Sequence, residues 1–583
     1  MSKNKNNSFV KGALILGIAS LIVKLIGAGF KIPMTNLIGD DGMGLFNGGY
    51  QIYTFMFIVA TAGFPVAISK MVSESLARDD ERDAKRVFQT AFSLLFVIGI
   101  VGSVVLFAFA GPFARAVGMP DAELGIKAIS PAIFFVSMAS ALRGYFQGRQ
   151  NMYPTALSEV IESTGKLVIG LLAAGFFMSM TVNTGAPNLI DMAAGVIQSS
   201  HLKTVYASAG AILGVTAGTF MSAALLITIY ICTAIAAKRH GEKLAPSVTA
   251  AQKLRPRKTI LKDLVLIAIP ITIGASVSSL TTLIDMSTIS RRLVVNPAVF
   301  DRYAFMFEQD AKFMQKVAQE GWNAAQVNVQ KATSLYGMYT GKALTMFNLP
   351  LTLVVALGTS VVPAISGSLA KGNKIQARSI TESAIRLALL FGAPCAIGMS
   401  VLSGGVLNLL FSTDNAKNVL AILSIAIIPV SVVQVTNAML QSYGKVYYPV
   451  VNMLIGGAAK VIFNYFMIPV LGIEGAPVGT FLCYLIIAVI NTVQIVRLSE
   501  MKFKPVDTII KPLVAALVMG VAGWFIAGVL PGSRLMTLLE IAVCGIIYAV
   551  MIFVVRAVKR EDLMNLPKGE KIAGILERFK LIK

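Results

Sequence analysis

The sequence predicts an all-α integral membrane protein with about 14 transmembrane helices, each a run of the ~20 apolar residues that the hydrocarbon core requires. Two observations predict this class. First, 56% of the 583 residues are hydrophobic and only 14% are charged, with a mean hydropathy of +0.74. Second, the apolar residues form long runs separated by polar loops. Because soluble domains carry about 25% charged residues, this chain has too little polar surface to coat a soluble globule.

The apolar runs must be helices, because a backbone inside lipid has to satisfy its own hydrogen bonds. The alternating segments of a membrane β-barrel are absent from the sequence. The first run begins near Phe9 and is too long for the apolar region of a signal peptide, so we expect an uncleaved first helix. The expected helices cover 9–33, 44–68, 87–110, 125–147, 155–180, 207–237, 261–289, 334–366, 380–403, 417–442, 447–470, 474–498, 508–530 and 535–557.

The net charge of +22 arises from Lys and Arg residues that lie mainly in loops and tails between apolar runs. This placement indicates membrane topology and contact with anionic membrane lipids, and it argues against a nucleic-acid-binding face. With the N-terminus in the cytoplasm, the basic loops at 70–86 and 238–262 and the C-terminal tail all lie inside, as the positive-inside rule requires. We therefore expect both termini in the cytoplasm.

Two pairs of sequence stretches resemble each other. The loop SESLARDDERDAKR at 73–86 matches SGSLAKGNKIQAR at 366–378, and each follows an apolar run with a proline near its end. A second pair, at 148–154 and 444–449, agrees with a similar offset. Chance similarity between apolar helices explains a charged loop in register poorly, so we interpret the pairs as an internal duplication.

The duplication predicts the domain organisation. Residues 1–245 form an N-terminal six-helix half, 258–500 a C-terminal six-helix half, and 501–583 two additional helices and a basic cytoplasmic tail. An even number of helices in each copy gives both copies the same orientation. The halves should then be related by an axis along the membrane normal, with a cavity at their interface, as in transporters that work by alternating access.

Two of the repeated stretches carry a family resemblance. LPLTLVVALGTSVVPAISGSLAKGN at 349–373 and its counterpart GFPVAISKMVSESLA at 63–77 resemble the multidrug/oligosaccharidyl-lipid/polysaccharide exporter superfamily. Over residues 9–500 the chain is similar to the polysaccharide biosynthesis branch of that superfamily. This branch contains the MurJ-type lipid II flippases and the stage V sporulation protein B type.

The resemblance implies a flippase, not an enzyme, in the bacterial cytoplasmic membrane. Such a protein translocates undecaprenyl-diphosphate-linked oligosaccharide, with lipid II as the first candidate, to the outer leaflet for peptidoglycan synthesis. Its partners would be the lipid-linked oligosaccharide and cell-wall synthesis enzymes. In VKLIGAGFK, Lys24 stands where MurJ-type first helices carry an Arg, and Lys31 stands near their Arg-Asp pair. In MYTGK, Lys342 stands at an Arg of their eighth helix.

Basic residues inside apolar runs are the candidates for a substrate site, because a charge at mid-membrane costs at least about 2.5–3.5 kcal/mol. Together they would form a cationic cavity that holds the diphosphate. The candidate substrate-binding residues are Lys24, Lys31, Lys342, Lys166, Lys460 and Arg143. Structural alternatives stay open for three of them. Lys24 could extend to the membrane surface, and Arg143 could anchor its helix at the inner interface. Lys166 could pair with Glu162, one helical turn earlier.

The acidic candidates are Glu159, Glu162 and Asp285, either as ion-coupling residues or as charge partners. Asp285 lies close to Arg291 in the sequence, so a salt bridge at the outer mouth is the simpler account. The four cysteines and two histidines lack metal-ligand spacing, so we expect no metal site. The Gly-Lys pairs lack the pattern of a phosphate-binding loop, so we expect no cofactor and no ATP hydrolysis.

Two other functions remain open. A cation-coupled multidrug antiporter of the same superfamily would bind cationic substrates and would need carboxylates in its cavity. The excess of intramembrane Lys over Asp and Glu argues against it. A non-transporting scaffold of a sporulation or division complex would leave costly buried lysines without a role.

Overall fold

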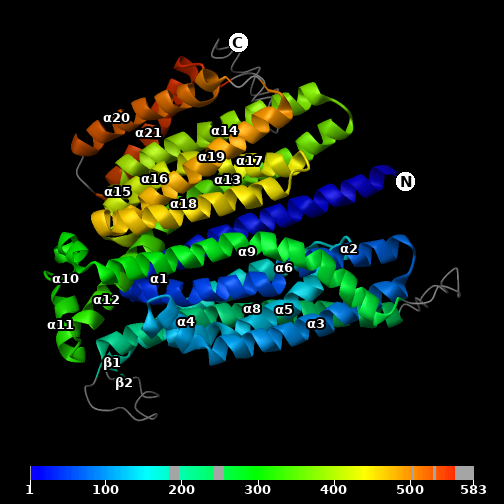
Figure 1. Cartoon of the computed structure of the whole chain (residues 1–583), viewed down its shortest axis with the longest axis horizontal. Coiled ribbons are helices and arrows are strands. Elements are labelled where there is room, and N and C mark those ends of the chain that lie inside the picture. The colour runs from blue at the N-terminus through cyan, green and yellow to red at the C-terminus, as the bar shows by residue number, and fades with distance from the viewer. Residues whose placement is uncertain are drawn as a thin grey trace. The chain divides into compact units, whose positions relative to one another are not determined.

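The computed structural model describes residues 2–182, 196–197, 199–239, 255–501, 504–529 and 533–558. This part of the chain is almost entirely helical (Figure 1), which confirms the predicted fold class. Its one sheet pairs two strands of two residues, β1 (Thr181–Val182) and β2 (Val196–Ile197), in parallel. The expected basic tail after residue 558 and most of the expected basic loop, at 240–254, lie outside the described residues.

The chain divides into two compact units. Unit 1 comprises Met1–Arg291 and Ala311–Gly337, and unit 2 comprises Arg292–Asp310 and Met338–Lys583. These units differ from the expected halves, because the expected seventh helix, 261–289, lies within unit 1. The expected halves were defined by repetition in the sequence, whereas the two units are defined by which residues pack together. The units therefore do not test the predicted domain limits, which stay a prediction.

The helices of unit 1 come mainly from the N-terminal part of the chain. They are α1 (Ser2–Thr61), α2 (Phe64–Ala77), α3 (Glu81–Ala108), α4 (Ala110–Ala116), η1 (Pro120–Ala122), α5 (Glu123–Gly148), α6 (Tyr153–Ser179), α8 (Ser200–Arg239), α9 (Arg257–Val295, up to Arg291), α11 (Ala311–Glu320) and α12 (Ala324–Gly337).

Unit 2 contains the remaining helices. They are η2 (Pro297–Tyr303), α10 (Ala304–Phe307), η3 (Met338–Ala343), α13 (Leu344–Ala370), α14 (Lys374–Val401), α15 (Ser403–Phe411), α16 (Lys417–Ile425), α17 (Ile427–Ser442), α18 (Tyr447–Leu471), η4 (Gly472–Glu474), α19 (Gly475–Ser499), η5 (Val506–Ile510), α20 (Lys511–Val529) and α21 (Arg534–Val554).

Within the described residues, 10 helical stretches are long and apolar enough to cross a membrane, or up to 11 if a bent pair counts as one span. The predicted number of helices is therefore not confirmed. Some stretches contain more than one expected helix. Tyr447–Ser499, with 53 residues, contains α18 and α19, which pack against each other. Ile15–Ala77, with 63 residues, contains a backbone break at Gly39, between the first two expected helices. Its φ of 70° is one that glycine adopts without steric cost.

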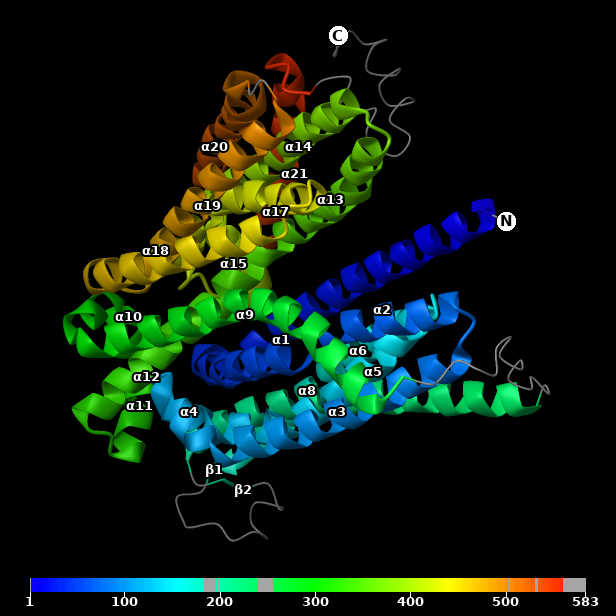
Figure 2. The same cartoon turned by 45° about the vertical axis from the view of Figure 1, so that its right-hand side comes forward.

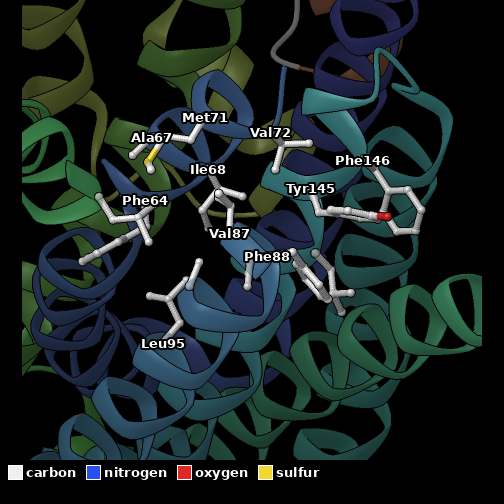
Figure 3. Packing of buried hydrophobic residues seen from close by; sticks show 14 of the residues in the cluster. Phe64, Ala67, Ile68, Met71, Val72, Val87, Phe88, Leu95, Tyr145 and Phe146 are labelled. Atoms are coloured by element: carbon white, nitrogen blue, oxygen red, sulfur yellow. The ribbon is translucent and has the colours of Figure 1, made fainter. Parts of the chain in front are cut away.

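The apolar core of unit 1 forms where α2, α3, α5 and α9 meet (Figure 3). Ile68 of α2, Phe88 of α3 and Tyr145 of α5 belong to one buried cluster, and the rings of Phe88 and Tyr145 lie 4.6 Å apart. Ile260 and Leu264 of α9 and Leu226 of α8 also belong to this cluster. Lipid is as apolar as these side chains, so close packing supplies most of the stabilisation here.

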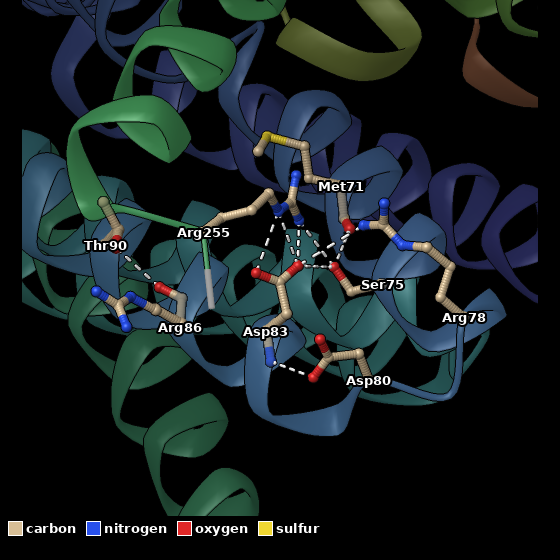
Figure 4. Close-up of polar contacts among 8 residues, drawn as sticks. All are labelled: Met71, Ser75, Arg78, Asp80, Asp83, Arg86, Thr90 and Arg255. Atoms are coloured by element: carbon tan, nitrogen blue, oxygen red, sulfur yellow. Dashed lines mark hydrogen bonds and ion pairs between the residues drawn. The ribbon is translucent and has the colours of Figure 1, made fainter. Parts of the chain in front are cut away.

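A buried ion pair attaches the start of α9 to the turn between α2 and α3 (Figure 4). The Asp83 carboxylate, whose side chain is 3% exposed, accepts hydrogen bonds from Arg255 Nε at 3.0 Å, from Arg255 Nη2 and from the Ser75 hydroxyl at 2.7 Å. The hydrogen bond with Asp83 raises the pKa of Arg255 above its ordinary value. Further along, the Gly63 amide donates to Thr272 Oγ1 at 3.1 Å. Thus contacts at two positions, Arg255 just before α9 and Thr272 within it, attach this helix to unit 1.

The turns that precede α3 and α14 have the same backbone conformation. Asp79, with φ of 57°, and Gly372, with φ of 72°, both adopt the left-handed region. One residue later, Asp80 accepts a hydrogen bond from the amide three residues ahead at 2.9 Å, and Asn373 does so at 3.0 Å. These side chains cap their helices in the same way. The similarity of the two loops therefore extends from sequence to local structure, which supports the predicted duplication.

Candidate functional site

Helix α6 carries ionisable side chains in a row. Glu159, Glu162 and Lys166 recur at spacings of three and four residues, so they share one helix face. Helix α6 packs along α8 and also contacts α1, and both views show α6 and α8 side by side (Figures 1 and 2). A Cβ atom at Gly214 of α8 would come within 2.4 Å of Gly170 Cα of α6. Glycine at these positions therefore lets the two backbones approach closely.

Arg143 of α5 neutralises the middle member of this row. Its Nη2 lies 2.7 Å from Glu162 Oε2, and the two side chains are 13% and 27% exposed. The guanidinium also donates to the hydroxyls of Ser158 at 3.0 Å and Ser222 at 2.9 Å. Glu162 is thus paired with Arg143, and among the described residues no ion pair joins Glu162 to Lys166. Three helices, α5, α6 and α8, meet in this one network.

Lys166 lies over aromatic rings instead. Its Nζ is 4.3 Å from the centroid of the Tyr50 ring and 5.1 Å from that of the Phe30 ring. The face of an aromatic ring attracts a cation, and it does so more strongly when water is excluded. Lys31 directly follows Phe30 on α1, so the contact of the Lys166 ammonium with the Phe30 ring places Lys166 next to the segment that carries Lys31. Unit 1 therefore brings two of the predicted basic residues together.

Two further predicted residues lie on the same two helices, α1 and α6. Lys24 is two helical turns before Lys31 on α1, on the same face and roughly 10 Å away along the axis. Its side chain is exposed in unit 1. Glu159 is half-buried on α6, within electrostatic reach of Arg143 and Glu162.

The remaining basic candidates belong to unit 2. Lys342 lies in the π-helical turn η3, 5% exposed, and its Nζ donates to Asn415 Oδ1 at 2.8 Å. Single π-helical turns occur frequently at functional sites. Lys460 is half-buried on α18. The structure thus groups Lys24, Lys31, Lys166 and Arg143 in unit 1. One cavity shared with the lysines of unit 2 stays a prediction.

Asp285 is buried on α9, with 8% exposure. Its predicted partner Arg291 donates through Nη2 to the carbonyl oxygen of Ala116 at 2.6 Å. Arg291 therefore connects the C-terminal part of α9 to the end of α4.

The partners of the charged side chains are the residues that sequence reasoning missed. Ser158, Ser222, Phe30 and Tyr50 are residue types common in membrane helices, so none of them carries a signal of its own. Only the contact between helices distant in the sequence gives them a role.

The repeat offers a further signal. At the sequence offset that relates the lysines of α6 and α18, Ser158 corresponds to Asn452 and Arg143 to Asn437. In unit 2, Asn452 Nδ2 donates to Asn491 Oδ1 at 2.7 Å, and Asn491 Nδ2 donates to Asn437 Oδ1 at 2.8 Å. At these corresponding positions unit 2 therefore has a network of neutral amide side chains, whereas unit 1 has a network that contains the Arg143–Glu162 ion pair.

Comparisons with known proteins identify relatives of this chain. A family model described as polysaccharide biosynthesis protein matches residues 9–369, and one described as lipid II flippase MurJ matches residues 328–543. The chain is 25% identical over 535 residues to lipid II flippase MurJ of Bacillus subtilis (strain 168), which covers 89% of this chain and 88% of that protein. It is 23% identical over 571 residues to stage V sporulation protein B of the same organism, with 96% and 98% covered.

A solved structure has a similar fold. Lipid II flippase MurJ in an inward closed conformation superposes with a TM-score of 0.65 at 11% sequence identity, over 93% of this chain and 98% of that one. This likeness concerns the fold alone. The first family model covers more than half of the chain, and the resemblance predicted from the two repeated stretches is confirmed. The chain therefore belongs to the polysaccharide biosynthesis protein family.

Proposed function

We propose that this protein is a flippase that moves a lipid-linked oligosaccharide, with lipid II as the leading candidate, from the inner to the outer leaflet of the bacterial plasma membrane. The family and the names of its relatives support a role in polysaccharide or cell-wall synthesis. The observation that carries the proposal is the pair Lys31 and Lys166 in unit 1. The proposal includes cytoplasmic termini, anionic lipids around the basic loops, and delivery of the substrate to cell-wall synthesis enzymes outside.

The lysine pair has the chemistry of an anion-binding site. Within the described residues, no carboxylate forms an ion pair with Lys31 or Lys166. Two neighbouring cations without a counter-ion repel each other, and the repulsion grows where water is scarce. A bound diphosphate would replace this repulsion by two attractions. Lysine acts as a point charge and binds phosphate well in that way. Lys24, on the same face of α1, would extend the basic path along the helix.

The antiporter alternative needs a carboxylate that is available to a cationic substrate or ion. In unit 1 the Glu162 carboxylate already accepts a hydrogen bond from Arg143, and the half-buried Glu159 lies within electrostatic reach of the same arginine. The site in unit 1 therefore favours an anionic ligand. The scaffold alternative makes a different prediction from the flippase. If the protein is a scaffold without transport, substitutions that remove the charge of the lysines should leave its function intact.

The decisive test is the rescue of a bacterial strain depleted of its own lipid II flippase. We expect the wild-type chain to restore growth and outer-leaflet lipid II. Lys31→Ala and Lys166→Ala should fail at normal protein levels, and Lys166→Arg should retain partial function because the charge is kept. Lys70→Ala is the matched control, because Lys70 lies exposed beside Glu74 with 59% of its side chain accessible.

The same assay tests the shared cavity. Lys24→Ala and Lys342→Ala should also abolish rescue, and Lys24→Glu should be worst because it repels the diphosphate. Failure of the wild-type chain to rescue, or normal rescue by all the alanine variants, would contradict the proposed function.

A further inference from the structure

Lys166 has two neighbours that could hold its ammonium group. One is Glu162, four residues earlier on α6, at the spacing that suits an ion pair. The other is the pair of rings from Phe30 and Tyr50 on α1. The structure has the second arrangement. The difference matters because a carboxylate cancels the charge of the lysine, whereas a ring face attracts the ammonium and leaves its charge intact.

The rings are fixed in place by their own packing. Phe30 and Phe46 have ring centroids 5.7 Å apart, and Phe46 and Tyr50 are stacked at 5.6 Å with an angle of 13° between the ring planes. Phe30 is 1% exposed and Phe46 is fully buried. Gly170 of α6 leaves the space that Phe30 needs, since a Cβ atom there would lie 2.9 Å from Phe30 Cε2. These rings also connect the two parts of α1, because Phe30 lies before the backbone break at Gly39 and Phe46 and Tyr50 lie after it.

Arg143 engages the carboxylate of Glu162, which would otherwise compete with the rings for the Lys166 ammonium. Its guanidinium occupies Glu162 Oε2 at 2.7 Å and is itself held by the hydroxyls of Ser158 and Ser222. Lys166 therefore has little to gain from turning toward Glu162. The rings and the arginine act together: the rings attract the ammonium toward Lys31, and Arg143 keeps the nearest carboxylate engaged.

We propose that Phe30 and Tyr50 are positioning residues that hold the Lys166 ammonium beside Lys31, so that both cations remain available to the diphosphate of the substrate. The inference rests on the proposed function and adds to it the means by which the side chain of Lys166 is oriented within the anion site. Removal of the Tyr50 ring should let Lys166 adopt other rotamers, and the affinity for diphosphate should fall.

The test uses the purified full-length protein and a soluble probe, farnesyl diphosphate, with binding measured by isothermal titration calorimetry. We expect Tyr50→Leu to bind about tenfold more weakly, as the loss of a partly desolvated cation–π contact predicts. Tyr50→Phe should bind like the wild type, because it keeps the ring. Tyr206→Leu is the matched control, since it removes a ring stacked on Phe177 at 5.7 Å, away from the lysines.

A double-mutant cycle separates positioning from general damage to the fold. If Tyr50 acts through Lys166, then adding Tyr50→Leu to Lys166→Ala should cost no further affinity. Additive losses, an unchanged Tyr50→Leu, or an equal loss in Tyr50→Phe would each overturn the inference. If Tyr50→Leu does not fold, Phe30→Leu provides the same comparison against the other ring.

The outcomes also separate this inference from the proposed function. Absence of farnesyl diphosphate binding in the wild type, or binding unaffected by Lys31→Ala and Lys166→Ala, would count against the diphosphate site and with it the proposed function. Binding that depends on both lysines but not on Tyr50 would remove only the positioning role of the rings.

Discussion

Arg143 and Glu162 place opposite charges among the helices of unit 1, where each would be costly alone. The carboxylate accepts one hydrogen bond from the guanidinium, and two serine hydroxyls accept two further N–H groups. Removal of one partner of a buried ion pair leaves the other without compensation, which is more costly than removal of both. The pair therefore explains why a basic residue on α5 is tolerated, whether or not it also contacts substrate.

Arg143→Ala should destabilise the protein by about 1–3 kcal/mol, because it leaves the partly buried Glu162 carboxylate without its hydrogen-bond partner. The double variant with Glu162→Ala should recover a large part of that loss. Thermal unfolding of the purified protein in detergent measures both. Arg149→Ala is the control, since its ion pair with Glu81 is 36% and 39% exposed and should be worth less than about 1 kcal/mol. A double variant no more stable than Arg143→Ala would mean that the pair does not explain the loss.

At the scale of the element, α9 illustrates how packing differs from sequence order. The duplication predicts α9 as the first helix of the second copy, yet its residues up to Arg291 belong to unit 1. The reason lies in its contacts: Ile260 and Leu264 enter the buried cluster with α2, α3 and α5, and Arg255 binds Asp83.

Asp83→Asn should loosen the start of α9. The substitution keeps the shape of the side chain but removes the charge that the Arg255 guanidinium binds, at a cost of about 1.5–3 kcal/mol for hydrogen bonds to a charged group. We expect faster hydrogen exchange at the amides of residues 257–268.

Asp79→Asn is the matched control for this experiment. Asp79 lies exposed in the same turn at a positive φ of 57°, which asparagine tolerates well. Exchange rates in α9 that are equal in the two variants would show that the Asp83–Arg255 contact does not hold the helix.

The turns that follow α5 and α17 form the second repeated pair, and their backbone conformation shows which residues of the two sequence copies correspond. Gln150, with φ of 59°, and Gly444, with φ of 78°, are the left-handed residues that end α5 and α17. In each turn the amide of the following residue donates to a carbonyl oxygen five residues earlier, at 3.0 Å in the first and 2.8 Å in the second. The structural equivalent of Gly444 is therefore Gln150, two residues from the Gly148 that the sequence comparison pairs with it.

At the scale of the whole molecule, the chain passes between the two units three times, after Arg291, Asp310 and Gly337. The last passage lies within the single stretch Ala324–Leu369, next to the π-helical turn that contains Lys342. Alternating access requires two bodies that move relative to each other around a substrate site. The two compact units provide the two bodies that this mechanism requires.

The membrane topology is a prediction of the same scale. The loop charges place both termini in the cytoplasm, so a reporter fused after Lys583 or inserted near Ala245 should read as cytoplasmic. One inserted near Asn323 should read as external. Paired enzyme reporters that are active on opposite sides of the membrane provide the measurement, and each serves as the control for the other. External readout at Ala245 would contradict the model of two parallel halves.

The sequence by itself determined the membrane fold, the family and the repeated turns. Apolar runs force helices because a backbone in lipid has no other way to satisfy its hydrogen bonds, and helix caps such as Asp80 and Asn373 are local features. It also singled out Lys31, Lys166, Arg143 and Glu162, because charges in apolar runs are conspicuous.

Only the tertiary structure decided which of these charges meet. Lys166 and Glu162 are good partners on one isolated helix, yet Arg143 takes the carboxylate and Tyr50 and Phe30 take the lysine. It likewise decided that most of α9 packs with unit 1. The physical reason is the same in both cases. Competing contacts within one helix and between helices differ by only a few kcal/mol, and close packing of helices distant in the sequence selects among them.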